Sequence, residues 1–436
     1  MIQSKTINKE LLRLAVPNIL SNISVPLLSS VDTALMGHES IKHLGAVGIG
    51  AMIFNFLYWN FGFLRMGTTG FTAQAYGAKD QTEIISTLFR AGFLALCISV
   101  LLVLFSQGVG GLAIDLMYVQ TEQVDLVLKY FSIRILAAPA SLMLFALFGW
   151  YFGMQNSIFP LLITITLNIV NILLSFLFVK QYGWGIEGVA WGTVAAQYTG
   201  LIIALLLFLI RYRSCLTALE LASLKQVDKV VSFLKINGDI FIRTFCLTFV
   251  FGFFYSQSSK MQANTLEINT ILMQFLNWMS YGVDGFAYAA ESLVGKYLGA
   301  ANKEKLKLSV RQSFRWGMGF ALLYAIVYGA FGEQLLGLFT NETILIQASM
   351  GYLFWMIILP IAGTPCYILD GIFVGLAASK QMRNGMLISM LLFLTVFYSF
   401  KTSYGNHGLW FALCIFLVVR ALVLWWYYRR GEFKRV

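Results

Sequence analysis

LLRLAVPNILSNISVPLLSSVDTALMG, residues 11–37, is an apolar run long enough to cross a membrane as one helix, yet it contains an aspartate, Asp32. A charged group at membrane depth costs at least ~2.5–3.5 kcal/mol on insertion scales, so it is kept only where it faces protein or a water-filled cavity. At 100° per residue, four polar residues fall within about 80° of one another: Asn18, Asn22, Ser29 and Asp32. Asp32 is therefore expected on the inner face of this helix.

The same stretch contains Pro26, about two turns before Asp32. Proline removes one backbone hydrogen bond and can kink a helix. We therefore expect a helix that bends at Pro26 and carries a titratable group. The alternative is a structural aspartate that is hydrogen-bonded to a neighbouring helix.

The composition is typical of a polytopic membrane protein. Of 436 residues, 58% are hydrophobic and 12% are charged, with a mean hydropathy of +0.75, whereas soluble domains have about 25% charged residues. The five cysteines form no CxxC or Cys/His cluster, so neither a disulfide framework nor a metal site is expected. The polar start MIQSKTINKE leads into a full-length span without a cleavage motif, so no signal peptide is expected.

Apolar segments recur about twelve times along the chain. The expected spans are 11–37, 45–76, 87–107, 127–154, 158–180, 186–210, 233–256, 265–298, 310–331, 347–376, 385–404 and 407–428. Of the 31 Lys and Arg residues, 22 lie on one side of these spans and 5 on the other. This asymmetry predicts that both termini are cytoplasmic, and it explains the net charge of +11 by anionic lipid rather than by nucleic acid.

The two halves of the chain repeat at an offset of 222 residues. This shift places LLRLAVPN (11–18) on FLKINGDI (233–240) and TAQAYGA (72–78) on VGKYLGA (294–300). It also places Tyr130 on Tyr352, Gly149 on Gly371 and Gly153 on Gly375. Six spans per half give both repeats the same topology, so we expect two lobes related by a pseudo-two-fold axis along the membrane normal, as in some secondary transporters. The predicted lobes are 1–210 and 233–436, joined by a cytoplasmic linker, 211–232.

Polar side chains gather on single faces of several spans. In the fifth span, Asn168, Asn171 and Ser175 share one face, and Thr193 in the sixth is a further candidate. These side chains can hydrogen-bond Asp32 or coordinate a cation; the alternative is that they only join helices.

The second half carries a different set. In the eighth span a stripe about 80° wide holds Tyr281, Asp284, Tyr288 and Glu291. The tenth span carries Asp370, and the seventh carries Arg243. These groups predict an ion-pair network that is structural, functional or both. Phe254 replaces the equivalent of Asp32, so a single-ion site in the N-terminal half is expected.

Several segments resemble the multidrug and toxic compound extrusion (MATE) transporters, and within them the DinF branch. They are SNISVPLLSSVDTALMGH (21–38), FLRMGTTGFTAQAYGAKD (63–80), IRILAAPASL (133–142), DGFAYAAE (284–291), LDGIFVG (369–375) with MRN (382–384), and GNHGLWFAL (405–413). The resemblance covers nearly the whole chain and implies a twelve-helix, two-lobe efflux protein. It further implies that Asp32 is protonated as the first helix bends and drug leaves, with Asn168 and Asn171 as its partners.

One residue departs from the family pattern, because Ser175 stands where an aspartate is usual. The resemblance therefore implies that Asp32 is the only acid of the N-terminal site, with Asp370 as a second-lobe candidate.

The resulting prediction is a monomeric inner-membrane antiporter that exports cationic or amphipathic compounds in exchange for protons, with no cofactor. Na⁺ or dual coupling is the first alternative. A lipid-intermediate flippase is the second, which would need Arg65, Arg134 and Arg243 to face the cavity. An enzyme is not expected, because the chain has no HExxH or GxSxG motif and its histidines lie in short connections or at the first residue of a span.

Overall fold

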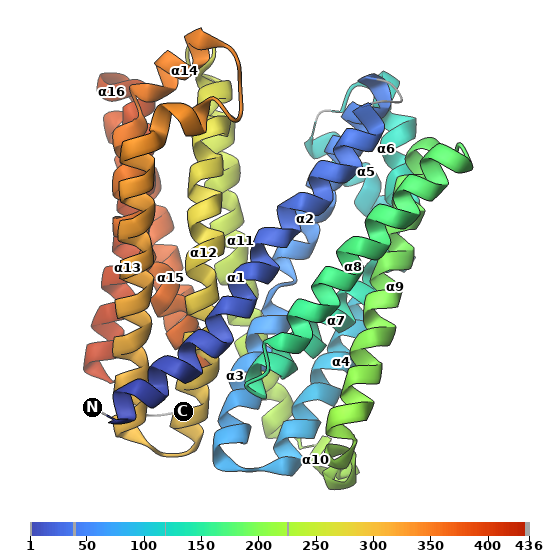
Figure 1. The fold of residues 1–436 in the computed structure, drawn as a ribbon, viewed down its shortest axis with the longest axis vertical. Coiled ribbons are helices and arrows are strands. Elements are labelled where there is room, and N and C mark those ends of the chain that lie inside the picture. Colours follow the sequence, from blue (N-terminus) through green and yellow to red (C-terminus); the bar gives the residue numbers. More distant parts are fainter. Residues whose placement is uncertain (1, 38–40, 118, 225, 432–436) are drawn as a thin grey trace. The chain divides into compact units, whose positions relative to one another are not determined.

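The computed structural model describes residues 2–37, 41–117, 119–224 and 226–431, except for the side chains of residues 2, 3, 25–37, 41, 42, 44 and 221. Within these ranges all regular structure is helical (Figure 1). Nine segments in the described part of the chain are long and apolar enough to cross a membrane. The predicted all-α membrane fold is confirmed.

The nine segments are compatible with twelve spans. The longest, α16 (Ser379–Arg430), contains two spans, because Gly405 within it has non-helical torsion angles (φ 51°, ψ −124°). Two further helices are long enough to cross: α1 (Ile2–Gly37) and α12 (Thr265–Gly299). The latter carries four charged residues, Glu267, Asp284, Glu291 and Lys296, which lower its mean hydropathy.

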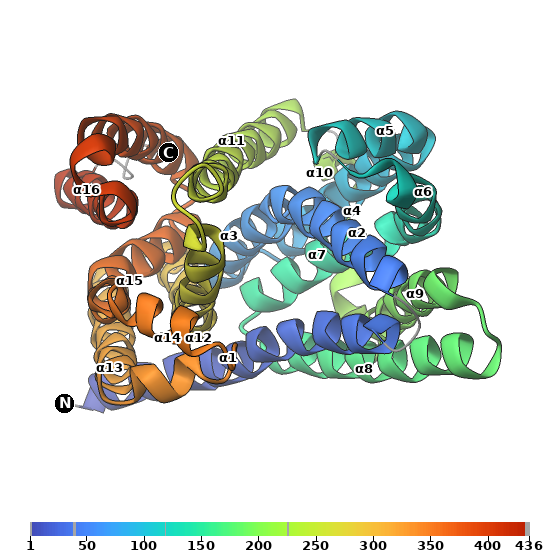
Figure 2. The same cartoon turned by 90° about the horizontal axis from the view of Figure 1, so that it is seen from above.

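The chain divides into two compact units. We call residues 20–233 the N-terminal unit, and residues 1–19 together with 234–436 the C-terminal unit. The main helices of the first are α2 (Ile41–Asn60), α3 (Phe63–Ala78), α4 (Gln81–Leu104), α5 (Ser106–Leu116), α6 (Thr121–Arg134), α7 (Ala138–Gly153), α8 (Ile158–Phe176) and α9 (Gly185–Tyr212). Those of the second are α11 (Val227–Ser258), whose first turns belong to the N-terminal unit, α12, α13 (Lys303–Leu336), α14 (Thr343–Met350), α15 (Leu353–Gly375) and α16. Figure 2 shows α12, α13 and α15 side by side.

The units differ from the predicted lobes at two places. Residues 1–19 pack within the C-terminal unit, where a Cβ on Gly285 would meet the Ala15 carbonyl oxygen at 3.0 Å. Residues 211–233 pack within the N-terminal unit: a short helix, α10 (Leu221–Leu224), lies on α4, and Ser223 hydrogen-bonds Ser86 at 2.6 Å. Packing defines the units, whereas the 222-residue repeat defined the predicted lobes.

The repeat is visible in the backbone of each unit. Three residues with a positive φ in the N-terminal unit have counterparts with a positive φ 222 positions later: Lys79 and Ala301, Gln155 and Ala377, Gly183 and Gly405. Immediately after the first pair, Asp80 caps α4 through the Glu83 N–H (2.9 Å) and Asn302 caps α13 through the Lys305 N–H (3.0 Å). The predicted repeat therefore recurs in turns and caps, which apolar composition alone would not produce.

Repeated glycines set one equivalent helix contact in each unit, between α3 and α7 and between α12 and α15. In the N-terminal unit a Cβ on Gly149 of α7 would collide with the Arg65 carbonyl oxygen of α3, and one on Gly153 would lie 3.0 Å from the Ala73 nitrogen. In the C-terminal unit Gly371 and Gly375 of α15 meet the equivalent backbone atoms of α12. Glycine is needed because the backbones approach closely.

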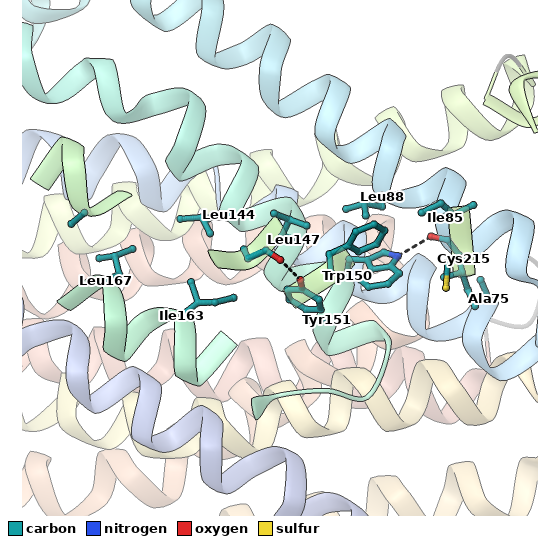
Figure 3. Packing of buried hydrophobic residues seen from close by; sticks show 14 residues of the cluster. Ala75, Ile85, Leu88, Leu144, Leu147, Trp150, Tyr151, Ile163, Leu167 and Cys215 are labelled. Atoms are coloured by element: carbon teal, nitrogen blue, oxygen red, sulfur yellow. Dashed lines mark hydrogen bonds between the residues drawn. The ribbon is translucent and has the colours of Figure 1, made fainter. Parts of the chain in front are cut away.

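Aromatic side chains of α7 join this helix to α4 and α9 in a buried hydrophobic cluster of the N-terminal unit (Figure 3). The indole of Trp150 donates to the Ile84 carbonyl of α4 at 2.9 Å, and the Tyr151 hydroxyl donates to the Ala204 carbonyl of α9 at 2.6 Å. Both side chains are fully buried. Each fills apolar space and satisfies its one polar group on a neighbouring helix.

Candidate functional site

The predicted coupling residue, Asp32, and the predicted hinge, Pro26, have side chains outside the described residues. The backbone around them belongs to α1, which is helical from Ile2 to Gly37.

Three of the four predicted partners meet on the inner faces of α8 and α9. The Asn171 amide donates to the Thr193 hydroxyl at 3.0 Å, and Thr193 donates to its own helix at the Val189 carbonyl, 3.1 Å away. Ser175 lies against Gly192, where a Cβ would be 2.5 Å from the serine oxygen. Asn171, Ser175 and Thr193 are each at most 2% exposed, so this is a compact buried polar cluster.

Two oxygens of this cluster lack a hydrogen-bond partner among the described residues: Oδ1 of Asn171 and Oγ of Ser175. Leaving a buried polar atom unpaired costs about 1–3 kcal/mol. Chains retain such atoms where a ligand, an ion or a further side chain meets them.

The fourth partner, Asn168, contacts α1 directly. Its amide donates to the Ser24 carbonyl at 3.1 Å. The Ser21 hydroxyl also donates to Thr164 of α8 at 3.2 Å. Pro26 lies in the same turn as Ser24 and supplies no N–H. The α8 face therefore binds α1 at the turn that proline weakens.

The charged residues of the C-terminal unit form a buried triad across three helices. The carboxylate of Asp370 on α15 accepts from the guanidiniums of Arg243 on α11 and Arg420 on α16, and one carboxylate oxygen takes both bonds. The three residues are 7%, 8% and 2% exposed, respectively. The Arg420 guanidinium also lies 5.3 Å from the centre of the Phe416 ring. Two buried cations thus share one carboxylate, which leaves little room for a further cation at that oxygen.

A second ion pair lies on α11 one turn before Arg243. Asp239 accepts from Arg383 of α16 at 2.6 Å and from Ser379 at 2.9 Å. The Arg383 side chain is 28% exposed, so this pair is more accessible to solvent than the triad.

The predicted stripe on α12 is only partly joined to the triad. Asp284 interacts electrostatically with Tyr281 of its own helix and with Cys366 and Tyr367 of α15, which also interact with Asp370. Tyr281, Asp284 and Tyr288 are half-buried, whereas Glu291 is 1% exposed at the α12–α15 contact. Of the predicted residues, Arg243 binds Asp370 directly, Asp284 interacts with Cys366 and Tyr367 of α15, and Glu291 lies in a helix interface.

Two groups in the C-terminal unit escaped sequence reasoning. The first is Arg420: an ionisable residue within a span is expected to have a buried partner, so its position in the sequence could have indicated the triad. The other group is an amide pair: Asn269 of α12 and Asn406 of α16 exchange two bonds of 2.7 and 2.9 Å, and Trp410 donates to Asn269 at 2.8 Å. It lies next to the break at Gly405 and binds the part of α16 that follows the break to α12.

Comparison with known proteins agrees with this architecture. The MatE family model matches residues 17–177 and again residues 240–399, so its second match begins 223 and ends 222 residues after the first. The chain is similar to DNA damage-inducible protein F of Escherichia coli (strain K12), with 36% identity over 426 residues, which covers 97% of this chain and 92% of that protein. It is also similar to the probable multidrug resistance protein NorM of Thermotoga maritima, with 25% identity over 352 residues, 79% of this chain and 74% of that protein.

Solved structures share the fold at low sequence identity. One described as MATE in the bent conformation superposes with a TM-score of 0.89 at 18% identity and covers 100% of this chain and 99% of that one. The outward-facing conformation of a multidrug resistance MATE family transporter gives 0.88 at 18% identity, over 99% and 97%. With two family matches that together span most of the sequence, the chain belongs to the MatE family, that of the MATE transporters.

Proposed function

We propose that this multi-pass inner-membrane protein exports cationic or amphipathic organic compounds in exchange for protons, with Asp32 as the proton-carrying group. Membership in a transporter family supports transport rather than catalysis. The relatives named as multidrug resistance proteins support small organic substrates. The excess of basic residues on one side of the spans supports cytoplasmic termini.

The observation that carries the proposal is the polar face of α8. It holds α1 through the bond from Asn168 to the Ser24 carbonyl, and it presents oxygens at Asn171 and Ser175 that have no hydrogen-bond partner among the described side chains. Protonation of a carboxylate converts an acceptor into a donor. Protonated Asp32 would therefore change its bonding to this face and allow α1 to bend at Pro26. One charge crossing 100 mV supplies about 2.3 kcal/mol to the cycle.

Sodium coupling is the second candidate, and the same oxygens favour it. Hard cations take carbonyl, hydroxyl and carboxylate oxygens as ligands. Asn171 Oδ1 and Ser175 Oγ are of this kind, and neither accepts a bond from a described residue. An experiment must therefore vary the two ions separately.

A lipid-intermediate flippase is disfavoured by the arginines. Arg65 lies 5.8 Å from the centre of the Phe152 ring, Arg134 lies 4.9 Å from that of Phe54, and Arg243 pairs with Asp370. Arg134 also donates to the Tyr130 hydroxyl, so two of the three guanidiniums are hydrogen-bonded within their own unit, whereas the flippase alternative needs all three to face the cavity.

The decisive test uses purified protein in proteoliposomes with tetraphenylphosphonium as the transported cation. The pH gradient and the Na⁺ gradient are imposed separately. We expect wild-type transport to follow the pH gradient and Asp32→Asn to lose that dependence. Asp125→Asn, which changes an exposed acid of α6, serves as the matched control. Unchanged pH dependence in Asp32→Asn would refute the proton role, and transport driven only by Na⁺ would establish the second candidate.

A further inference from the structure

The end of α16 combines arginines with partly exposed tryptophans. Its last six residues are WWYYRR, residues 425–430. The side chains of Trp425 and Trp426 are 36% and 46% exposed, and Arg429 and Arg430 are exposed. Tryptophan at a helix end is typical of the membrane–water interface, where head groups lie.

The guanidiniums are oriented by these rings. Arg430 lies 3.8 Å from the centre of the Trp426 ring and Arg429 lies 5.4 Å from that of Trp425. The Trp425 ring is in turn stacked with Tyr428 at 5.7 Å and 21°. An arginine stacked on an aromatic face keeps its in-plane N–H donors available for a phosphate.

Helix α13 extends this surface with further cations. Phe314 contacts Trp425 edge to face, with 5.9 Å between ring centres, so the two helices touch at this level. Arg311 and Arg315 are exposed and flank Phe314 along α13. Neither residues 305–315 of α13 nor any residue of α16 is acidic. The surface therefore presents four exposed guanidiniums beside two exposed indoles.

We propose that this surface, formed by Arg311, Arg315, Trp425, Trp426, Arg429 and Arg430, binds the head group of an anionic phospholipid. The guanidiniums bind the phosphate, and the tryptophans contact the glycerol and upper acyl region. A lipid is favoured over a free anion because the indoles supply an apolar contact that inorganic phosphate cannot use. This site is independent of the coupling ion and of the exported substrate.

The test measures lipid retention by native mass spectrometry of the full chain, released from nanodiscs that contain equal amounts of phosphatidylglycerol and phosphatidylcholine. We expect wild type to retain phosphatidylglycerol preferentially. In R429Q/R430Q the preference should fall about 30-fold, since each basic residue near a membrane surface contributes about fivefold. The matched control is K180Q/K260Q, which removes the same charge from two exposed lysines elsewhere.

Two further measurements separate the alternatives. Trp426→Leu keeps every charge, so a lowered preference of this variant for phosphatidylglycerol would show that the indole contacts the lipid. It also tests the proposal if R429Q/R430Q fails to fold. Inorganic phosphate at 50 mM is added to the wild type as a competitor. Equal losses in R429Q/R430Q and K180Q/K260Q would overturn the proposal in favour of net charge. Complete displacement by phosphate would overturn it in favour of a free-anion site.

Discussion

Replacing Asp370 by asparagine should destabilise the C-terminal unit more than any other single removal of an acid. The substitution preserves the shape of the side chain and removes the one negative charge that two buried guanidiniums share. Arg420 and Arg243 are 2% and 8% exposed, so water cannot replace the lost partner without opening the helix packing. Breaking a buried ion pair by removing one partner costs about 3–5 kcal/mol.

The magnitude is large on the scale of folding. Domains are stable by about 5–15 kcal/mol, so the variant would lose a third or more of a typical value. For a unit of this size, ~2–4 °C per kcal/mol predicts a fall in Tm of roughly 6–20 °C. The assay is thermal unfolding of purified protein in detergent, followed by Trp fluorescence and by the size-exclusion peak that survives heating.

The double variant Asp370→Asn with Arg243→Gln isolates the electrostatic part. It removes one cation together with the anion and leaves Arg420 as the only charge of the triad. We expect it to recover at least about 1.5 kcal/mol relative to the sum of the single variants, because residues of one network couple by 0.5–3 kcal/mol. Asp239→Asn is the graded control: its partner Arg383 is 28% exposed, so the loss should stay near 1 kcal/mol. An Asp370→Asn protein whose Tm equals that of the wild type would refute the reasoning.

Two other predictions concern helix contacts. Gly371→Ala and Gly149→Ala should each lower the free energy of unfolding by about 1–3 kcal/mol, and Tm with it. The reason is overpacking, because the new Cβ would meet a backbone carbonyl of the facing helix. Gly319→Ala on α13 has no atom within 4 Å of its added Cβ and should be neutral or stabilising by up to ~1 kcal/mol; equal effects at the three positions would contradict the packing argument. Asn269→Ala should cost about 1–3 kcal/mol, since it leaves the buried side chain of Asn406 without its two bonds. Limited proteolysis near Gly405 should then be faster than in wild type, and an unchanged cleavage rate would count against a fixing role.

Much of the site was predictable wherever the signal was local. Asn168, Asn171 and Ser175 share one helical face by spacing alone, and Thr193 was expected near them; the structure joins Asn171 to Thr193 and seats Ser175 on α9. The spacing did not indicate that Asn168 would turn to the backbone of α1. Periodicity gives the face of a helix but not the partner that the face meets.

The sequence alone determined the membrane-spanning helical fold and the repeat of 222 residues. Hydropathy, span length and turn residues are local properties, and the repeat is a comparison of the chain with itself. Only the tertiary structure decided that Asp370 lies between Arg243 and Arg420, and that Asn269 pairs with Asn406. These partners are 50 to 137 residues apart along the chain, and their meeting depends on how apolar helix faces rotate and pack against one another. Dispersion contacts between whole surfaces set that rotation, so no single position in the sequence encodes it.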